Sequence, residues 1–449
     1  MRNTLTDWLI HLESLHPKTI ELGLARVRKV GQRLNLDPDF LIITVGGTNG
    51  KGSVCAMLES ILCAAGYSVG CYTSPHLLRY NERVRINKKQ ASDETLCASF
   101  ESVEQARKSQ QPDSRFCGET GELPACSVNG DLSEIPLTYF EFGTLAAMQC
   151  FIKHKVEVAI LEVGLGGRLD AVNIFDSDCS VVTAVDIDHT DYLGETREQI
   201  AFEKAGIFRC GKVAICADAD APQAITDQAE KMRALLWKIG RDFFFAEQKT
   251  NQWSYRSVIG TRNSLPYPAL RGAFQLHNAS AALAVLDALK ERLPVSMDAV
   301  RRGLLGVQLP GRFHVVPGRP QLILDVAHNP QAARSLAQNL AGLMPCPPHT
   351  YAVFAMLKDK DMASVVAALD SHIDTWLVAG IAVSRGAAAE DLAQVLRQCG
   401  VRGKIKVFQR IAEALSYAYN AADENDRIVA FGSFHTVAEV MSVKGFQVL

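Results

Sequence analysis

Short, predominantly apolar runs alternate along this chain with stretches in which apolar residues recur at helical spacing. The runs lie at 40–45, 69–72, 156–163, 180–185 and 213–217. Each predicts a strand that is buried on both faces, as strands of a parallel sheet are. Strands that alternate with helices predict an α/β fold with a mostly parallel sheet.

The helical stretches near the N-terminus have identifiable breaks. Pro17 interrupts the first stretch, so we predict a short helix, a loop and a second helix that begins at about Ile20. After the first strand and a Gly-rich turn, a helix is expected from about Ser53 to Ala65. Gly66 then suits the C-terminal cap of that helix.

A Gly/Pro-containing segment, GVQLPG at 306–311, separates two such patterns. It follows a helical run over 279–305, and the alternation restarts after it. The elements expected there are strands at 321–326, 351–355 and 427–431 and a helix at 331–343. With 449 residues, the chain is long for one core. We predict two α/β domains, 1–305 and 312–449, joined by a linker at 306–311.

Residues 109–135 interrupt the pattern. They show no periodicity and collect Ser, Gly, Pro and Asp, which predicts a surface loop or insertion. Cys117 and Cys126 lie there in polar surroundings, where an exposed thiol would be reactive. The other cysteines are scattered without a C-x-x-C pair, so we expect reduced core residues rather than zinc ligands.

Composition narrows the function to small-molecule chemistry. The formal net charge is −2, and no long Lys/Arg run is present, so nucleic acid is not an expected partner. The N-terminus lacks the apolar core of a signal peptide, and no run of about 18 apolar residues predicts a membrane span. A cytoplasmic enzyme without a membrane partner is expected.

The turn after the first strand, in ITVGGTNGKGS, has the composition of a phosphate-binding loop. Backbone amides and a helix N-terminus there can hold phosphate oxygens. The candidate residues are Gly47, Thr48, Asn49, Gly50, Lys51, Gly52 and Ser53. Lys51 would supply positive charge, and Ser53 would supply a hydroxyl to Mg²⁺. Gly52 departs from the strict G-x-x-x-x-G-K-[ST] pattern, and glycines that serve only a tight βα turn remain the alternative.

Two further predicted strands end in residues able to bind a cation. Glu162 ends one strand, and His189 follows another in DIDHTDYLG. Carboxyl ends of strands gather in one crevice of an open α/β sheet, so these side chains can share a metal near the phosphate turn. A turn-capping carboxylate and a satisfied strand-end histidine remain the alternatives. GLGG at 164–167 lacks the full spacing of a dinucleotide-binding turn, which disfavours an oxidoreductase.

Segments along nearly the whole chain carry a resemblance to one family. In chain order they are TVGGTNGKGS, YTSPHLLRYNERVRIN, TYFEFGTLAAM, LEVGLGGRLDAVN, DIDHTDYLG, EKAGIFR, LPGRFHVV, ILDVAHNP and GSFHTVAEVM. They resemble the signatures of the dihydrofolate synthase/folylpolyglutamate synthases of the Mur ligase superfamily, in the same order. Gly52 is itself typical of that family's turn. The resemblance implies a P-loop domain that binds ATP and pterin, followed by a smaller C-terminal glutamate-ligase domain.

The resemblance also implies roles for single residues. Lys51 and Ser53 would hold the β/γ-phosphates and a first Mg²⁺, while Glu162, His189 and a carbamylated Lys204 would hold a second. Further roles follow by position: Asn278 for adenine, Arg312 for the phosphates, Asp325 for the nucleotide side, His328 and Ser433 for glutamate, and Thr138, Phe140 and Asp170 for the pterin. Lys51, Lys204, His189, Arg312 and His328 would be the catalytic group.

The implied reaction is ATP-dependent amide synthesis through an acyl phosphate. L-Glutamate would be joined to dihydropteroate and to the γ-carboxylate of reduced folates, by a monomer. A muropeptide-extending Mur ligase would share the ATP residues, but LHPKTIELGLARV, YTSPHL and TYFEF favour the folate branch. A regulatory P-loop ATPase is a rival from another class. It differs from a ligase in that it would need no second carboxylate substrate. A nicotinamide-binding protein is a more distant rival.

Overall fold

The computed structural model describes residues 4–18, 20–109, 134–248, 252–272, 274–344 and 346–446. The α-helices are α1 (Leu5–Ser14), α2 (Ala25–Arg33), α3 (Lys51–Ala64), α4 (Asp93–Lys108), α5 (Tyr139–Lys153), α6 (Thr190–Leu193), α7 (Arg197–Ala205), α8 (Gln223–Met232), α9 (Gln275–Ala288), α10 (Met297–Leu305), α11 (Pro330–Ala341), α12 (Met362–Leu369), α13 (Ala389–Gln398), α14 (Ile411–Ala421) and α15 (Phe434–Val443). The first eight strands are β1 (Leu41–Gly46), β2 (Val69–Tyr72), β3 (Val84–Ile86), β4 (Lys89–Gln90), β5 (Val158–Glu162), β6 (Cys179–Val182), β7 (Val213–Cys216) and β8 (Leu235–Lys238). The others are β9 (Phe243–Gln248), β10 (Gln252–Ser257), β11 (Thr261–Pro266), β12 (His314–Val316), β13 (Gln321–Leu324), β14 (Thr350–Phe354), β15 (Thr375–Ala379), β16 (Lys404–Phe408) and β17 (Arg427–Phe431).

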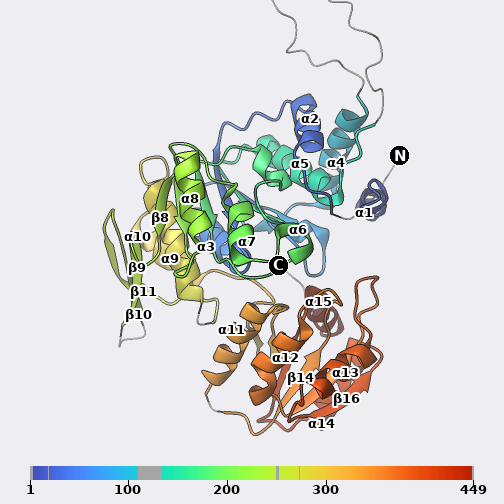
Figure 1. Cartoon of the computed structure of the whole chain (residues 1–449). Helices are drawn as coiled ribbons and strands as arrows, with labels where there is room; N and C mark the ends of the chain where they lie inside the picture. Colours follow the sequence, from blue (N-terminus) through green and yellow to red (C-terminus); the bar gives the residue numbers. More distant parts are fainter. Residues whose placement is uncertain are drawn as a thin grey trace, which may run out of the picture.

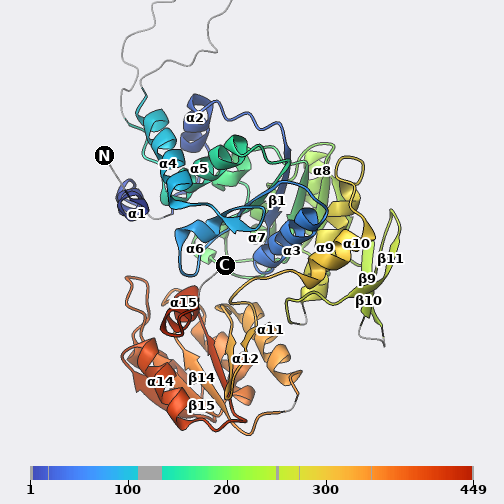
Figure 2. The same cartoon turned by 180° about the vertical axis from the view of Figure 1, so that it is seen from behind.

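The largest sheet has eight strands in the order β4-β3-β2-β5-β1-β6-β7-β8. Neighbours from β2 to β8 are parallel, and β3 and β4 add an antiparallel edge. Helices α3, α9 and α10 pack on one face, in front in Figure 2, and the other face carries α1, α2, α4, α5, α7 and α8. The predicted α/β class is confirmed, since helices bury both faces of a mostly parallel sheet.

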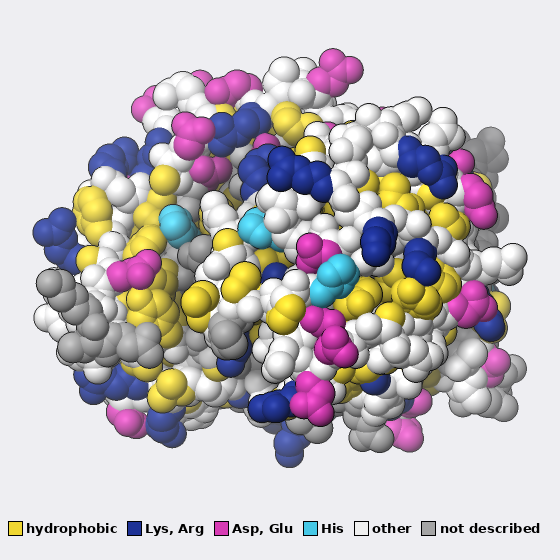
Figure 3. Space-filling model, turned by 90° about the horizontal axis from the view of Figure 1, so that it is seen from below, with side chains coloured by type: hydrophobic (Ala, Val, Ile, Leu, Met, Phe, Trp, Pro, Cys, Tyr) yellow, Lys and Arg dark blue, Asp and Glu magenta, His cyan; other side chains and the backbone are white. Residues whose placement is uncertain are grey.

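The second sheet, in the lower part of Figure 1, has six strands in the order β12-β13-β17-β14-β15-β16. All its neighbouring strands are parallel except β12 and β13. One core lies between the sheet and α11, α12 and α13, and another lies beneath α14 and α15. On the face drawn in Figure 3, basic and acidic side chains of the described residues are interspersed.

Some expected boundaries were wrong for local physical reasons. Residues 20–24 are not helical; Gly23 has φ +153°, and its N–H donates to the carbonyl of Leu169 (3.3 Å), so α2 begins only at Ala25. The helical run over 279–305 is two helices, α9 and α10, with Pro294 between them. Strand β6 ends at Val182, three residues before the predicted end.

The third sheet was not predicted from the pattern of apolar positions. In it, β11, β10 and β9 form an antiparallel meander. Residues 110–133 of the predicted insertion, with Cys117 and Cys126, lie outside the described residues. The described residues on either side of it lie side by side, because the N–H of Ile135 donates to the carbonyl of Arg107 (3.2 Å). Within the described part of the chain, each helix is too short or too polar to cross a lipid bilayer.

Candidate active site

The phosphate-type turn joins β1 to α3, and its shape depends on glycine. Gly47 and Gly50 have φ +138° and +91°, values that side chains rarely permit. A Cβ on Gly50 would lie 2.6 Å from Oδ1 of Asn278, so that buried side chain lies against the turn. Helix α3 begins at Lys51 rather than at Ser53, which places the N-terminal amides of a 14-residue helix at the turn.

Lys51 folds back over this turn. Its ammonium donates to the carbonyls of Gly47 (3.0 Å) and Thr48 (3.2 Å). The Thr48 hydroxyl in turn donates to the carbonyl of Asp186 (3.1 Å), in the loop after β6. The protein's own hydrogen bonds therefore join the turn to that loop.

Glu162 ends β5, directly beside β1, and is buried together with Ser53. Its carboxylate accepts the N–H of Ser74 (3.1 Å). Burial raises the pKa of Glu162, and the charges of Lys51 and Arg312 oppose that rise. A Cβ at position 52 would lie 4.0 Å from both carboxylate oxygens, at ordinary van der Waals distance, so Glu162 lies directly beside the start of α3.

His189 is the left-handed N-cap residue of α6, with φ 53°. Burial lowers its pKa to about 4, with Asp188 opposing, so the imidazole is neutral at pH 7 and can donate a lone pair to a metal. Its Nε2 lies 3.4 Å from the ammonium of Lys360. The charged end of Lys360 therefore lies next to the imidazole ring of His189.

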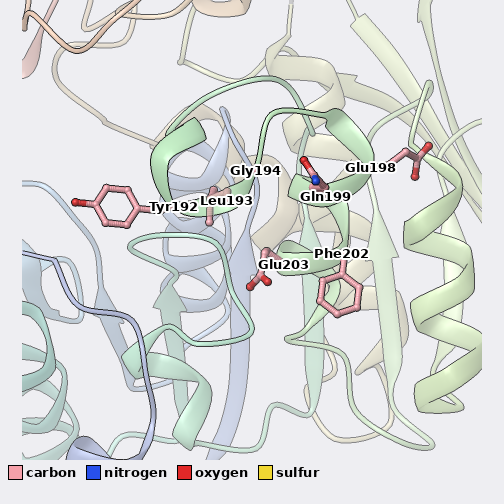
Figure 4. A pocket seen from close by; sticks show the side chains of 7 residues that line it. All are labelled: Tyr192, Leu193, Gly194, Glu198, Gln199, Phe202 and Glu203. Carbon is pink, nitrogen blue, oxygen red and sulfur yellow. The ribbon is translucent and has the colours of Figure 1, made fainter.

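Lys204 lies on the buried side of α7, with 4% of its surface exposed. Figure 4 shows Gln199, Phe202 and Glu203 of the same helix lining an open surface pocket. Burial, and secondarily the charge of Lys51, lowers the pKa of Lys204 to about 7. A large fraction of neutral amine at physiological pH is unusual for lysine and marks this side chain for chemistry.

The donor set fits Mg²⁺ under one condition. Among the described residues, no group of three or more His, Cys, Asp and Glu side chains is placed to hold a metal ion. The predicted set instead combines Ser53, Glu162, His189 and Lys204. Mg²⁺ prefers oxygen ligands, so the set fits if Lys204 supplies an oxygen anion, which a carbamate has and an amine lacks.

Two of the predicted C-terminal residues approach the first domain's site. The Arg312 guanidinium stacks over the ring of Phe434, 4.9 Å from its centroid. Burial lowers the pKa of Arg312, and the charges of Asp325 and Glu162 oppose this. Asp325 follows β13 and accepts the N–H groups of Phe313 and Ala327 (2.8 Å each). Arg312 is therefore within electrostatic range of one carboxylate from each domain.

The two expected glutamate residues have different surroundings. His328 donates through Nδ1 to the carbonyl of Val326 (2.8 Å), which leaves Nε2 as an acceptor 3.8 Å from a carboxylate oxygen of Asp188. Ser433 is buried and caps α15, accepting the N–H of Thr436 (3.0 Å). His328 therefore faces the interface between the domains, while the Ser433 hydroxyl is engaged locally.

The three expected pterin residues gather near the end of β5. Phe140 packs on Gly164, where a Cβ would lie 2.7 Å from the ring, and on Tyr72, with centroids 5.7 Å apart. Asp170 accepts the N–H of Leu165 (2.8 Å), and burial raises its pKa to about 7. Thr138 caps α5 in a reciprocal box with Glu141. Arg26 donates to that glutamate (3.1 Å), which joins LHPKTIELGLARV to TYFEF.

Known proteins match this chain over nearly its whole length. A model of the Mur ligase middle domain matches residues 127–286, and one of the Mur ligase glutamate ligase domain matches 311–434. The dihydrofolate synthase/folylpolyglutamate synthase of Escherichia coli (strain K12) is 44% identical over 440 residues, covering 98% of this chain and 95% of that protein. The one from Haemophilus influenzae is 38% identical over 457 residues, covering 98% and 97%.

This chain belongs to the dihydrofolate synthase/folylpolyglutamate synthase family of Mur ligases. Its fold matches E. coli FolC in complex with DHPP and ADP, with a TM-score of 0.88 and 42% identity over 99% of this chain and 98% of that one. A solved bifunctional folylpolyglutamate synthase/dihydrofolate synthase with Mn, AMPPNP and L-glutamate bound has a TM-score of 0.86 and 43% identity, also over 99% and 98%. The resemblance stated from sequence motifs is confirmed, as are the ligase class and the Mur-type two-domain architecture.

Two polar residues at the domain interface, Lys360 and Asn329, were missing from the predicted site. Lys360 follows β14 and donates to Oδ1 of Asp188 (2.7 Å), next to His189. Asn329 follows His328 and contacts both Asp188 and Asn49. The segments DIDHTDYLG and ILDVAHNP are among those that carry the family resemblance, but no periodicity indicates which side chains meet across a domain interface. LKDKDM around Lys360 has no sequence signal of a site.

Proposed function

We propose that the protein activates the carboxylate of dihydropteroate, and the γ-carboxylate of reduced folates, as an acyl phosphate and joins it to L-glutamate. One observation carries the proposal: the charges of Lys51, on the phosphate-type turn, and of Arg312, from the other domain, both act on the buried carboxylate of Glu162. The ligands named for the related structures, DHPP with ADP and AMPPNP with L-glutamate, are the expected components of this reaction.

The residues have separable tasks in this mechanism. A carboxylate is a poor acyl donor, so the substrate oxygen first attacks the γ-phosphoryl group of ATP. The bond between the β- and γ-phosphates breaks, ADP leaves, and an acyl phosphate is formed. Lys51, the amides of the turn and Arg312 stabilise the charge on that group, with Asn278 on the adenine side and Asp325 orienting Arg312. His328 and Ser433 hold the incoming glutamate, whose amine displaces phosphate as the amide forms. The docked domains exclude water that would hydrolyse the intermediate.

Ser53 is proposed to hold one Mg²⁺, and Glu162, His189 and a carbamylated Lys204 to hold another. When bound, the two ions would neutralise charge on the transferring phosphoryl group. The lowered pKa of Lys204 supports the modification, because only a neutral amine adds carbon dioxide. The buried carboxylate of Glu162 and the neutral ring of His189 are suitable ligands.

The remaining assignments complete the proposal. We propose that the chain divides into a first domain at 1–305, a linker at 306–311 and a second domain at 312–449. This division is supported by the end of α10 at Leu305 and the start of the six-stranded sheet at His314. Thr138, Phe140 and Asp170 are proposed to bind the pterin. A cytoplasmic monomer is proposed as the working form.

The deciding experiment follows phosphate release from ATP and Mg²⁺. Purified protein is offered 7,8-dihydropteroate or tetrahydrofolate, with and without L-glutamate. We expect sustained release only when a folate carboxylate and glutamate are both present, and a product heavier by one glutamate in mass spectra. Release that needs neither would indicate a regulatory ATPase, and release only with a nucleotide-linked muropeptide would indicate the other Mur branch.

Phe140→Ala tests the pterin assignment. We expect kcat/KM for dihydropteroate to fall about tenfold or more, as loss of an aromatic stacking partner allows. Extension of a reduced folate should suffer less, because the longer substrate has additional anchoring groups. Both activities are compared in steady-state assays.

Gly164→Ala is the companion variant to Phe140→Ala. This variant retains the Phe140 ring but should displace it, since a Cβ on residue 164 would lie 2.7 Å from a ring carbon. It should reproduce the selective loss in milder form. Equal loss of both activities in Phe140→Ala would refute a dedicated platform role.

A further inference from the structure

The two domains meet through a small set of hydrogen bonds centred on Asn329. This residue is 3% exposed and lies between β13 and α11. Its Oδ1 accepts the N–H of Ala332 (2.9 Å), which makes it the N-cap of α11. Such a cap explains an Asn at the position, yet Asp, Ser or Thr would serve the helix as well. Capping of α11 therefore does not account for the side-chain amide nitrogen of Asn329.

That nitrogen is used across the interface. Nδ2 of Asn329 donates to Oδ1 of Asn49 (3.2 Å) and to Oδ2 of Asp188 (3.3 Å). Nδ2 of Asn49 returns a bond to Oδ1 of Asn329 (3.2 Å) and makes another to Gln331 (2.5 Å). A single C-terminal side chain thus contacts the phosphate-type turn and the loop that carries His189.

Asp188 is bonded to the C-terminal domain through both carboxylate oxygens. Oδ1 accepts the ammonium of Lys360 (2.7 Å), and Oδ2 accepts Asn329. The side chains of Asp188 and Lys360 are only 11% and 7% exposed. His189, the next residue, has a left-handed backbone conformation. A hydrogen bond from its N–H to Oδ1 of Asp188 (2.9 Å) helps to fix this conformation.

We propose that Asn329 is a positioning residue that couples docking of the C-terminal domain to the geometry of the nucleotide and metal site. It acts through Asn49 on the turn and through Asp188 on His189. The inference rests on the proposed function and deepens it: full ligase geometry forms only when the glutamate-binding domain is docked. Phosphoryl transfer then depends on docking of the domain that binds glutamate, the substrate whose amine attacks the acyl phosphate.

The test exchanges an amide and a carboxylate across the interface. Asn329→Asp keeps the helix cap and the side-chain length but sets an oxygen anion against Asp188. We expect glutamate-dependent kcat/KM to fall on the order of tenfold to a hundredfold, within the usual range of coupling between contacting residues. Asp188→Asn in the same chain restores a donor and acceptor pair. Its amide oxygen can still accept the ammonium of Lys360, so the double variant should recover most of the loss.

Ser296→Ala supplies the matched control. Ser296 caps α10 and accepts the N–H of Ala299 (3.2 Å), away from the interface. Loss of this cap should lower the melting temperature and leave kcat/KM unchanged. If Asn329→Asp retains full activity, or if Asp188→Asn does not restore it, the coupling role is wrong.

Small-angle X-ray scattering with ADP separates this inference from the proposed function. We expect the radius of gyration to rise in Asn329→Asp and to return towards the wild-type value in the double variant. That result holds even if the wild type shows no folate-dependent phosphate release, which would refute the proposed function alone. Unchanged scattering in Asn329→Asp, together with normal ligation by the wild type, would refute the inference alone.

Discussion

Lys204→Ala is expected to abolish glutamate ligation while leaving the fold and most of the ADP affinity intact. The phosphate turn keeps Lys51 and its backbone amides, so nucleotide binding persists. What is lost, under the proposed assignment, is the oxygen anion that the second Mg²⁺ would require. Acetate or propionate should partly restore activity by placing a carboxylate in the vacated space. Phosphate release and ADP titration measure the two properties separately.

Two further variants keep this prediction falsifiable. Lys204→Arg retains a cation but forms no carbamate, so it should be as inactive as Lys204→Ala. Lys231→Ala removes an exposed lysine from neighbouring α8 and should have wild-type activity and stability. Normal turnover in Lys204→Ala or Lys204→Arg would leave the metal to Glu162 and His189 alone.

The carbamate also predicts a pH dependence. Lys204 has its pKa lowered to about 7, so its neutral fraction grows as pH rises through 7 instead of through the ordinary range near 10.5. Enzyme depleted of carbon dioxide at low pH should regain activity when dissolved carbon dioxide is restored. At the same concentration of dissolved carbon dioxide, recovery should be faster at pH 8 than at pH 6. Equal rates at both values would contradict a reactive neutral amine.

Much of the fold was predictable because its signals are local. Buried parallel strands give apolar runs, and β2 spans the same residues as its predicted run. The C-cap residue of α3 is Ala65, and the predicted cap residue Gly66, at φ +96°, directly follows it. The meander β9–β11 had no such signal, because its strands mix exposed and buried positions irregularly. The break between α9 and α10 rests on Pro294, within an otherwise helical pattern.

The site was predictable in part, for a related reason. Residues on the phosphate turn are indicated by glycine spacing, and Glu162 by its place at a strand end. Lys204 on α7 would pass as a solvated helix residue, and the family resemblance alone singled it out. Asn329 and Lys360 depend on which side chains face each other once two domains dock, and that information is spread over sequence separations of 280 and 172 residues.

Lys51→Met should be the second severe variant, for two reasons that add. The ammonium would no longer stabilise the transferring phosphoryl group, a loss on the order of a hundredfold to a thousandfold when one such donor is removed from an active site. It would also cease to lower the pKa of Lys204, so less neutral amine would be present at pH 7 and carbamate formation would weaken. Phosphate release at saturating ATP measures the combined effect.

The two contributions can be separated by pH. Raising the pH restores the neutral amine of Lys204 but never the missing charge of Lys51. We therefore expect the activity of Lys51→Met to rise more steeply than that of the wild type between pH 7 and 9 in bicarbonate, and to remain well below the wild type at every pH. A constant ratio of variant to wild-type activity across this range would mean that Lys51 acts on the phosphates alone and that burial by itself sets the state of Lys204.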